Sequence, residues 1–173
     1  MPSQWTLTTL FESRVREYPD RLVVVAGDRS HSFRQVDAQS TALAAAFAEL
    51  GVEHGDRVAV NLPNGVEWLV TLMACARLGA VVVPISPQLN IHELRYQLRH
   101  AETSLVVTIE QLDGVDFLQR FEDVLADLPD LHYVVTVGKE DLWYDDRIFQ
   151  FEDLLSKGSG RAVPASPSTH DHD

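Results

Sequence analysis

The amino-acid sequence predicts an α/β fold with a predominantly parallel sheet, flanked by helices in three layers. Short apolar runs rich in valine, isoleucine and leucine recur along the chain, and most are followed by a stretch with helical periodicity. Crossovers between parallel strands need roughly a dozen residues or more. Nearly unbroken apolar runs are typical of strands that helices cover on both faces.

The N-terminal part is expected to form a helix, a hairpin and a second helix. Thr6 is a favourable N-cap, and apolar residues follow it at helical spacing. Residues 22–26 and 31–33 have strand character, and Gly27 with Asp28 is typical of a hairpin turn. Residues 34–50 carry an apolar stripe of helical period and end before a glycine, which predicts the second helix.

The next part has the strand and helix rhythm of a parallel sheet. Asn64 followed by Glu67 predicts a capping box at the start of one helix, and Asn90 followed by Glu93 predicts another. The second of these helices should cover 91–101, where apolar residues fall on one clean stripe. The strands predicted in this part are 57–61, 81–84 and 105–109.

The last part is expected to contain a helix over 115–128, a strand over 131–137 and a short helix over 149–155. Beyond these, the sequence fills with glycine, serine and proline and loses its periodicity. Such a composition is typical of linkers. We therefore expect one α/β subdomain over 1–155 and a flexible linker or tail over 156–173.

Charge and cysteine content exclude several classes of protein. The formal net charge is −12 and there is no basic patch, which argues against nucleic-acid binding. Cys75 is the single cysteine, so no disulfide framework is expected, and its apolar helical context predicts a small buried hydrophobe. No stretch of 18 apolar residues and no signal-peptide pattern is present, so we expect a cytoplasmic protein without a membrane span.

Negative charge is concentrated in residues 102–155, which hold 14 acidic and 3 basic side chains. Such a surplus usually serves solubility, so a solvated flank is the favoured interpretation. A face that docks a partner is the alternative.

A search for known chemical motifs predicts no catalytic, cofactor-binding or metal-ligating residue in this chain. The glycine-rich phosphate loops are absent, and the nearest match, 158–160, lies in the linker-like segment. The His and Asp residues of 170–173 lack the fixed geometry of a metal site. No nucleophile elbow is found. Carboxylate pairs such as Glu122 with Asp123, and Asp145 with Asp146, are more consistent with solvated acids than with an acid/base pair.

The stretch ACARLGAVVVPISPQL, residues 74–89, has a clear structural interpretation. Its small residues allow a helix to press close against the sheet, and Gly79 permits the turn that follows. Pro84 ends strand pairing because it has no N–H. The strand then leads into the loop 85–89 at the carboxyl edge of the sheet, where α/β proteins usually bind ligands. A small-molecule site at this loop is therefore a third, minor hypothesis for function.

In their order, three segments resemble the N-terminal part of the adenylate-forming (AMP-binding) acyl-CoA synthetases, or carboxylic acid–CoA ligases. SFRQV (32–36) is similar to the first core motif of that superfamily, GDRVAVNLPNGVEW (55–68) to the strand and helix that follow, and ARLGAVVVPISP (76–87) to the second core motif. The resemblance covers about residues 5–155 and implies a Rossmann-like subdomain. Among subfamilies, the chain is more similar to ligases of fatty, alicyclic or aromatic acids than to peptide-synthetase domains.

Membership would imply that a carboxylate attacks ATP-Mg to give an acyl-adenylate, and that the thiol of coenzyme A then displaces AMP. The family's phosphate loop, magnesium-binding glutamate, ribose-binding aspartate and C-terminal lysine are not found in this chain. The resemblance thus implies an inert N-terminal fragment of such a ligase. Its expected partner is the remainder of the ligase, a second α/β subdomain and a C-terminal domain, which would supply the sites for ATP, Mg and coenzyme A.

One alternative is a free-standing, non-catalytic interaction module derived from such an enzyme, which would bind its partner through residues 102–155. A separate expectation follows from the apolar strands. If the sheet normally packs on a second subdomain, the chain alone should expose apolar surface and self-associate, forming a homo-oligomer.

Overall fold

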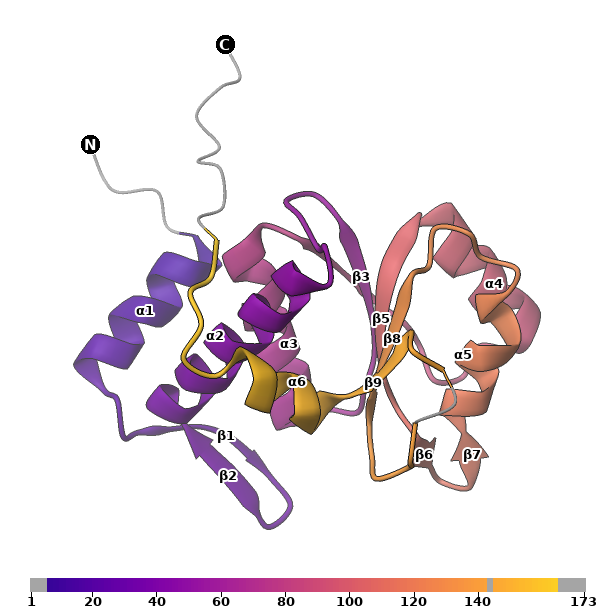
Figure 1. Ribbon diagram of the computed structural model, residues 1–173. Helices are drawn as coiled ribbons and strands as arrows, with labels where there is room; N and C mark the ends of the chain where they lie inside the picture. The colour runs from indigo at the N-terminus through magenta and orange to yellow at the C-terminus, as the bar shows by residue number, and fades with distance from the viewer. Residues whose placement is uncertain (1–5, 143–144, 165–173) are drawn as a thin grey trace.

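The computed structural model describes residues 6–142 and 145–164, and its centre is a five-stranded sheet (Figure 1). The strand order is β4-β3-β5-β8-β9, and each neighbouring pair is parallel. This confirms the predicted parallel sheet. The strands are β3 (Arg57–Asn61), β4 (Val81–Pro84), β5 (Thr103–Ile109), β8 (Tyr133–Val137) and β9 (Ile148–Gln150).

Helices cover both faces of the sheet, which gives the expected three layers (Figure 1). On one face, α2 (Phe33–Glu49), α3 (Val66–Leu78) and α6 (Phe151–Gly158) pack on the sheet, and α1 (Leu7–Glu17) contacts α2 and α3. On the other face lie α4 (Ile91–His100) and α5 (Phe117–Leu125). The alternating side chains of each strand contribute to one core or the other.

Of the two predicted capping boxes, one is present and one is not. The side chain of Asn90 accepts hydrogen bonds from the N–H groups of His92 and Glu93, so the predicted capping box of α4 is confirmed. The box predicted at Asn64 is wrong, because α3 has Gly65 as its N-cap and no side-chain cap. The carboxylate of Glu67, which was to complete that box, instead binds Arg29.

The predicted N-terminal hairpin is present, with β1 (Leu22–Ala26) antiparallel to β2 (Arg29–Ser32). Gly27 in the turn has a φ of 62°, a conformation that favours glycine. From β2, Arg29 reaches the N-terminal turn of α3 and donates to both carboxylate oxygens of Glu67, at 2.5 and 3.1 Å. This ion pair fixes the hairpin to the helical layer.

The helix expected over 115–128 is shorter than predicted. Its first two residues belong to a small antiparallel hairpin, formed by β6 (Gln111–Leu112) and β7 (Val115–Asp116), and α5 ends at Leu125. Asp113 and Gly114 both have positive φ, 50° and 77°, and make the turn of this hairpin. Asp116 then caps the helix by accepting from the N–H of Gln119.

The C-terminal helix also differs from the prediction over 149–155. Residues up to Gln150 form the edge strand β9, and α6 runs on to Gly158, past the predicted end. Arg161 pairs with Glu49, and Val163 packs on the core, so the first residues of the predicted tail are ordered against the body. Residues 165–173, with the predicted His and Asp run, lie outside the described part of the chain.

Candidate functional site

A row of polar side chains crosses the sheet at the carboxyl ends of four strands. By register, Asn61 of β3 lies beside Thr108 of β5, Thr108 beside Thr136 of β8, and Thr136 beside Gln150 of β9. The residues two positions earlier in each strand belong to the core beneath α4 and α5. Because side chains alternate along a strand, the polar row faces this same side. We call these four residues the polar row.

Part of the polar row is paired internally and part is not. The side-chain N–H of Asn61 donates to Thr108 Oγ1 at 3.1 Å, and the Thr108 hydroxyl donates to the carbonyl of Ile109 at 3.2 Å. Asn61 Oδ1 and Thr136 Oγ1 are buried, and neither has a hydrogen-bond partner among the described protein atoms. Buried polar atoms of this kind are uncommon and usually meet water or a ligand.

Glu110 continues the row and ties three strands together. Its side chain is buried, and its two carboxylate oxygens accept from the N–H groups of Lys139 and Glu140 at 2.8 and 3.0 Å, and from Gln150 Nε2 at 2.6 Å. Gly138 makes room for this carboxylate, since a Cβ there would lie 1.8 Å from it. Slight desolvation, together with the charge of Glu110, raises the pKa of the exposed Glu140 carboxyl.

Two hollows flank the polar row. One lies beneath the loop 85–89, has a volume of about 10 Å³, and includes Asn61 in its lining. The other is an open depression of about 560 Å³ at the ends of β5 and β8. Its lining includes Glu110, Gly138 and Lys139. The loop predicted to lie at the carboxyl edge of the sheet is therefore beside the polar row, but the hollow beneath it is too small for a metabolite.

The small-residue stretch of α3 is used for packing, as its sequence predicts. Cys75 is fully buried, and burial raises the pKa of its thiol to about 12. The prediction that it is a small buried hydrophobe is confirmed. Gly79 ends the helix in the left-handed conformation, with a φ of 73°. These residues position the strand β4 and the loop that follows it.

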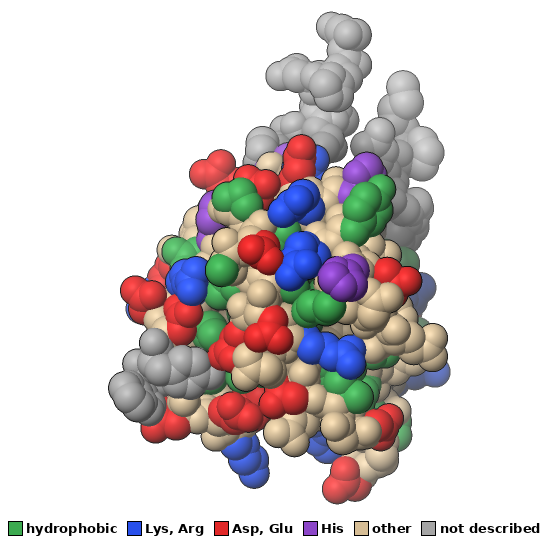
Figure 2. All heavy atoms as spheres, turned by 90° about the vertical axis from the view of Figure 1, so that its right-hand side faces the viewer, with side chains coloured by type: hydrophobic (Ala, Val, Ile, Leu, Met, Phe, Trp, Pro, Cys, Tyr) green, Lys and Arg blue, Asp and Glu red, His purple; other side chains and the backbone are tan. Residues whose placement is uncertain are grey.

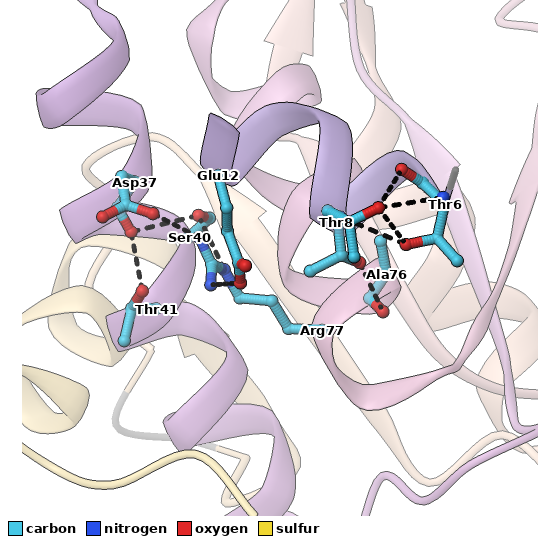
Figure 3. A network of polar contacts seen from close by, with 9 residues as sticks. Thr6, Thr8, Glu12, Asp37, Ser40, Thr41, Ala76 and Arg77 are labelled. Atoms are coloured by element: carbon cyan, nitrogen blue, oxygen red, sulfur yellow. Dashed lines mark hydrogen bonds and ion pairs between the residues drawn. The ribbon is translucent and has the colours of Figure 1, made fainter. Parts of the chain in front are cut away.

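Arg77, next to the small residues, joins α3 to α2 and α1 (Figure 3). Its guanidinium donates to Asp37 Oδ1 at 2.5 Å and to Ser40 Oγ at 3.3 Å, both on α2. It also lies 3.9 Å from Glu12 on α1. Thr8 of α1 donates to the carbonyl of Ala76 at 3.3 Å. The first residues of the second motif thus help to build the helical layer.

The glycine-rich segment and the paired acids have structural roles in the described part of the chain. Among residues 6–142 and 145–164, no group of three or more His, Cys, Asp or Glu side chains could hold a metal ion. The glycine-rich segment 158–160 is not an open phosphate loop, because Gly158 ends α6 and packs against the backbone of Ala42. Asp145, one of the paired acids, instead binds Arg147, whose hydrogen bond lowers the pKa of the Asp145 carboxyl.

The acidic residues of 102–155 are partly neutralised within the chain. Glu102 pairs with Arg57, and Asp127 pairs with Arg95. Acidic and basic side chains lie side by side on the face that carries α4 and α5 (Figure 2). This arrangement agrees with a solvated flank, and docking of a partner there stays a prediction. No helix in the described part of the chain is long and apolar enough to cross a membrane.

Comparison with known proteins identifies the family. Residues 11–172 match the model of the AMP-binding enzymes. The chain belongs to this family. The resemblance to adenylate-forming enzymes is therefore confirmed.

Relatives within the AMP-binding family include ligases of aromatic acids. A salicyl-AMP ligase / salicyl-S-ArCP synthetase of Mycobacterium tuberculosis is 37% identical over 94% of this chain, which spans 29% of that protein. A 2,3-dihydroxybenzoate-AMP ligase of Bacillus subtilis is 31% identical over 78% of this chain, which spans 25% of it. The chain thus spans less than a third of the length of these two relatives.

Solved structures support the same fold. An anthranilate CoA ligase in complex with anthranoyl-AMP matches 96% of this chain with a TM-score of 0.81 and 22% identity, and the match covers 31% of that protein. A coronafacic acid ligase from Pectobacterium brasiliense matches 90% of this chain with a TM-score of 0.77 and 17% identity, and the match covers 30% of that protein. At these identities, the likeness concerns the fold alone.

Sequence reasoning missed most of the polar row and Glu110. A partial signal was available, because the apolar runs of β3 and β5 carry a polar residue at or next to their carboxyl end, Asn61 and Thr108. Strand order and register were needed to show that these side chains are neighbours. Gln150 could not be included from sequence, since it was assigned to a helix.

Proposed function

We propose that this chain is the N-terminal α/β subdomain of an ATP-dependent carboxylic acid ligase that forms an acyl-adenylate and then a thioester with coenzyme A. One observation carries the proposal. The family model matches nearly the whole length of this chain, but the chain corresponds to less than a third of the length of the two relatives. The chain then supplies one sheet and its carboxyl edge to the enzyme. The remainder of the ligase supplies the sites for ATP, Mg and coenzyme A. The whole enzyme works in the cytoplasm.

The substrate that we propose is a small aromatic carboxylic acid. Two relatives that match much of this chain are ligases of salicylate and 2,3-dihydroxybenzoate by name. A long-chain-fatty-acid–CoA ligase of Bacillus subtilis is 31% identical over a shorter part, 62% of this chain. Aromatic acids are therefore favoured over the fatty acids that the sequence also suggested.

The architecture explains why the chain alone should be inert. Adenylate formation requires groups that stabilise the charge developing on the phosphates, from protein cations or metal ions. Among the described arginines, Arg77 is bound to Asp37 and Arg29 to Glu67. Arg120 donates to the carbonyl of Leu89 and lies over the ring of Phe117. The polar row has neutral side chains, and the carboxylate of Glu110 is fully engaged by hydrogen bonds. The chain therefore contributes a scaffold.

The experiment is carboxylate-dependent exchange between ATP and pyrophosphate. The chain alone should give none, with salicylate or 2,3-dihydroxybenzoate. A chimera in which it replaces the matching segment of the Mycobacterium tuberculosis relative should give salicylate-dependent exchange. The relative without its N-terminal segment is the control and should be inactive. A folded chimera without exchange would count against the proposed role.

A further inference from the structure

The strongest unexplained feature is the buried acceptor on Asn61. The residue is 3% exposed, and its Oδ1 has no hydrogen-bond partner in the described protein. An acceptor that is removed from water without a compensating hydrogen bond destabilises the folded state. The surrounding geometry should therefore show what the atom binds.

The neighbouring hydrogen bonds fix the orientation of the Asn61 amide. Thr108 has one hydroxyl proton, which it donates to the carbonyl of Ile109, so Thr108 Oγ1 is left as an acceptor. It can then be served only by the N–H of Asn61, at 3.1 Å. If the side-chain amide of Asn61 were flipped, its oxygen would face Thr108 Oγ1, and two acceptors without a proton between them would repel each other. Oδ1 is therefore the atom that faces away from Thr108.

Sheet order places the hollow on the opposite flank of Asn61. Strand β3 lies between β5, which carries Thr108, and β4, which leads into the loop 85–89. The lining of the hollow of about 10 Å³ includes Asn61, Ser86 and Arg120, with apolar residues such as Phe121 around them. An amide that directs its nitrogen toward β5 directs its oxygen toward this hollow. The binding partner must thus be a hydrogen-bond donor that fits there.

The size of the hollow selects that donor. A volume of about 10 Å³ is close to the minimum for one water molecule and excludes any metabolite. A buried water needs two to four polar partners, as is usual for such sites. Asn61 Oδ1 is one, and the hydroxyl of Ser86 and the guanidinium of Arg120 are further candidates in the lining.

We propose that one ordered water molecule occupies the hollow beneath the loop 85–89, donates a hydrogen bond to Asn61 Oδ1, and so joins β3 to that loop. This site is independent of the ligase function proposed above. The water adds to two direct hydrogen bonds of the loop, from the N–H of Ile85 to the carbonyl of Val60 in β3 and from the guanidinium of Arg120 to the carbonyl of Leu89.

The first test is a crystal structure of the wild-type chain at a resolution that places ordered waters. We expect one water within about 2.7–3.2 Å of Asn61 Oδ1, beneath the loop. An empty hollow would overturn the proposal, as would Oδ1 bound directly to the Ser86 hydroxyl or to the Arg120 guanidinium. Cross-peaks between water and the side-chain amide protons of Asn61 in nuclear Overhauser spectra provide the same test in solution.

A matched pair of variants separates the acceptor from the shape of the side chain. Asn61→Leu removes the oxygen and should lose the water, and exchange of the Gln88 amide proton in the loop should speed up roughly fivefold, the effect of one lost hydrogen bond. Asn61→Asp keeps an oxygen toward the hollow and should retain the water. A water that persists in Asn61→Leu would contradict the assignment, even if Asn61→Asp fails to fold.

Discussion

Arg77 of α3 and Asp37 of α2 form an ion pair whose nitrogen and oxygen lie 2.5 Å apart, with the arginine side chain only 12% exposed. The same guanidinium donates to Ser40, so two polar groups of α2 depend on one residue of α3. Helices α2 and α3 are also the pair that packs most extensively in this fold. The ion pair therefore fixes the helical layer on that face of the sheet.

Replacing Arg77 by alanine should lower the free energy of unfolding by about 2 kcal/mol, because Asp37 and Ser40 lose their partner in a partly buried place. Urea unfolding gives this difference from the shift of the midpoint. Arg14→Ala is the matched control, since the pair of Arg14 with Glu17 is exposed on both sides and should change stability by less than about 0.5 kcal/mol. Equal effects of the two variants would contradict this role of Arg77.

Glu110→Gln should destabilise the chain by about 2 kcal/mol. Its carboxylate accepts from two backbone N–H groups and one amide, and a glutamine would direct its own NH₂ group toward one of these donors. The neighbouring Glu140→Gln removes a similar charge at an exposed position and should stay within about 0.5 kcal/mol of wild type. If the two variants unfold at the same urea concentration, the Glu110 side chain does not hold the strand ends together.

Gly158→Ala tests whether the end of α6 is part of the packed body. A Cβ at this position would lie 1.9 Å from the carbonyl oxygen of Ala42. In the variant, α6 or the backbone of α2 must therefore move to relieve this clash. We expect a loss of about 2 kcal/mol. Gly65→Ala is the control, because a Cβ there would meet its nearest atom at 3.5 Å, and it should cost less than about 1 kcal/mol. A neutral Gly158→Ala would show that residues after 155 form a loose tail.

The ion pair between Glu67 and Arg29 predicts a dependence of stability on pH. Burial by itself raises the pKa of the Glu67 carboxyl. The hydrogen bond and charge of Arg29 lower this pKa by a larger amount, so the net pKa lies below its ordinary value of 4.5. The stabilisation of the fold by this ion pair is therefore complete at pH values above the pKa that Glu67 has in the unfolded chain. It is lost as the pH falls through the lower pKa that Glu67 has in the folded chain.

Arg29→Gln should raise the pKa of Glu67, because burial of the carboxyl remains while the cation is removed. Carbon-detected NMR titration of the Glu67 carboxyl measures this pKa directly. Arg34→Gln is the control, since Arg34 pairs with Asp20 and both side chains are largely exposed. A Glu67 pKa that is the same in wild type and Arg29→Gln would refute the coupling of the hairpin to α3.

Much of the fold could be predicted from sequence because the buried strands are continuous apolar runs. Residues 57–61 and 81–84 were predicted with the bounds that the structure shows. The edge strand β9 was missed because it has three residues and runs directly into α6, so its apolar residues matched a helical pattern. The hairpin at Asp113 and Gly114 was missed because its strands have only two residues each.

The polar row could not be derived from sequence because it depends on register. Asn61 and Thr136 are far apart in the chain, and only the order β3-β5-β8 places Thr108 between them. The failure at Asn64 has a different cause. Its capping partner Glu67 is taken by Arg29 of β2, a tertiary contact that overrides a local capping pattern.

The most direct test of the central claim, that this chain is the scaffold of a ligase and not its catalytic part, is the exchange of pyrophosphate into ATP in the presence of salicylate. The account predicts no exchange above background for the 173-residue chain and clear exchange for the chimera with the Mycobacterium tuberculosis relative. Salicylate-dependent exchange by the chain alone would contradict it.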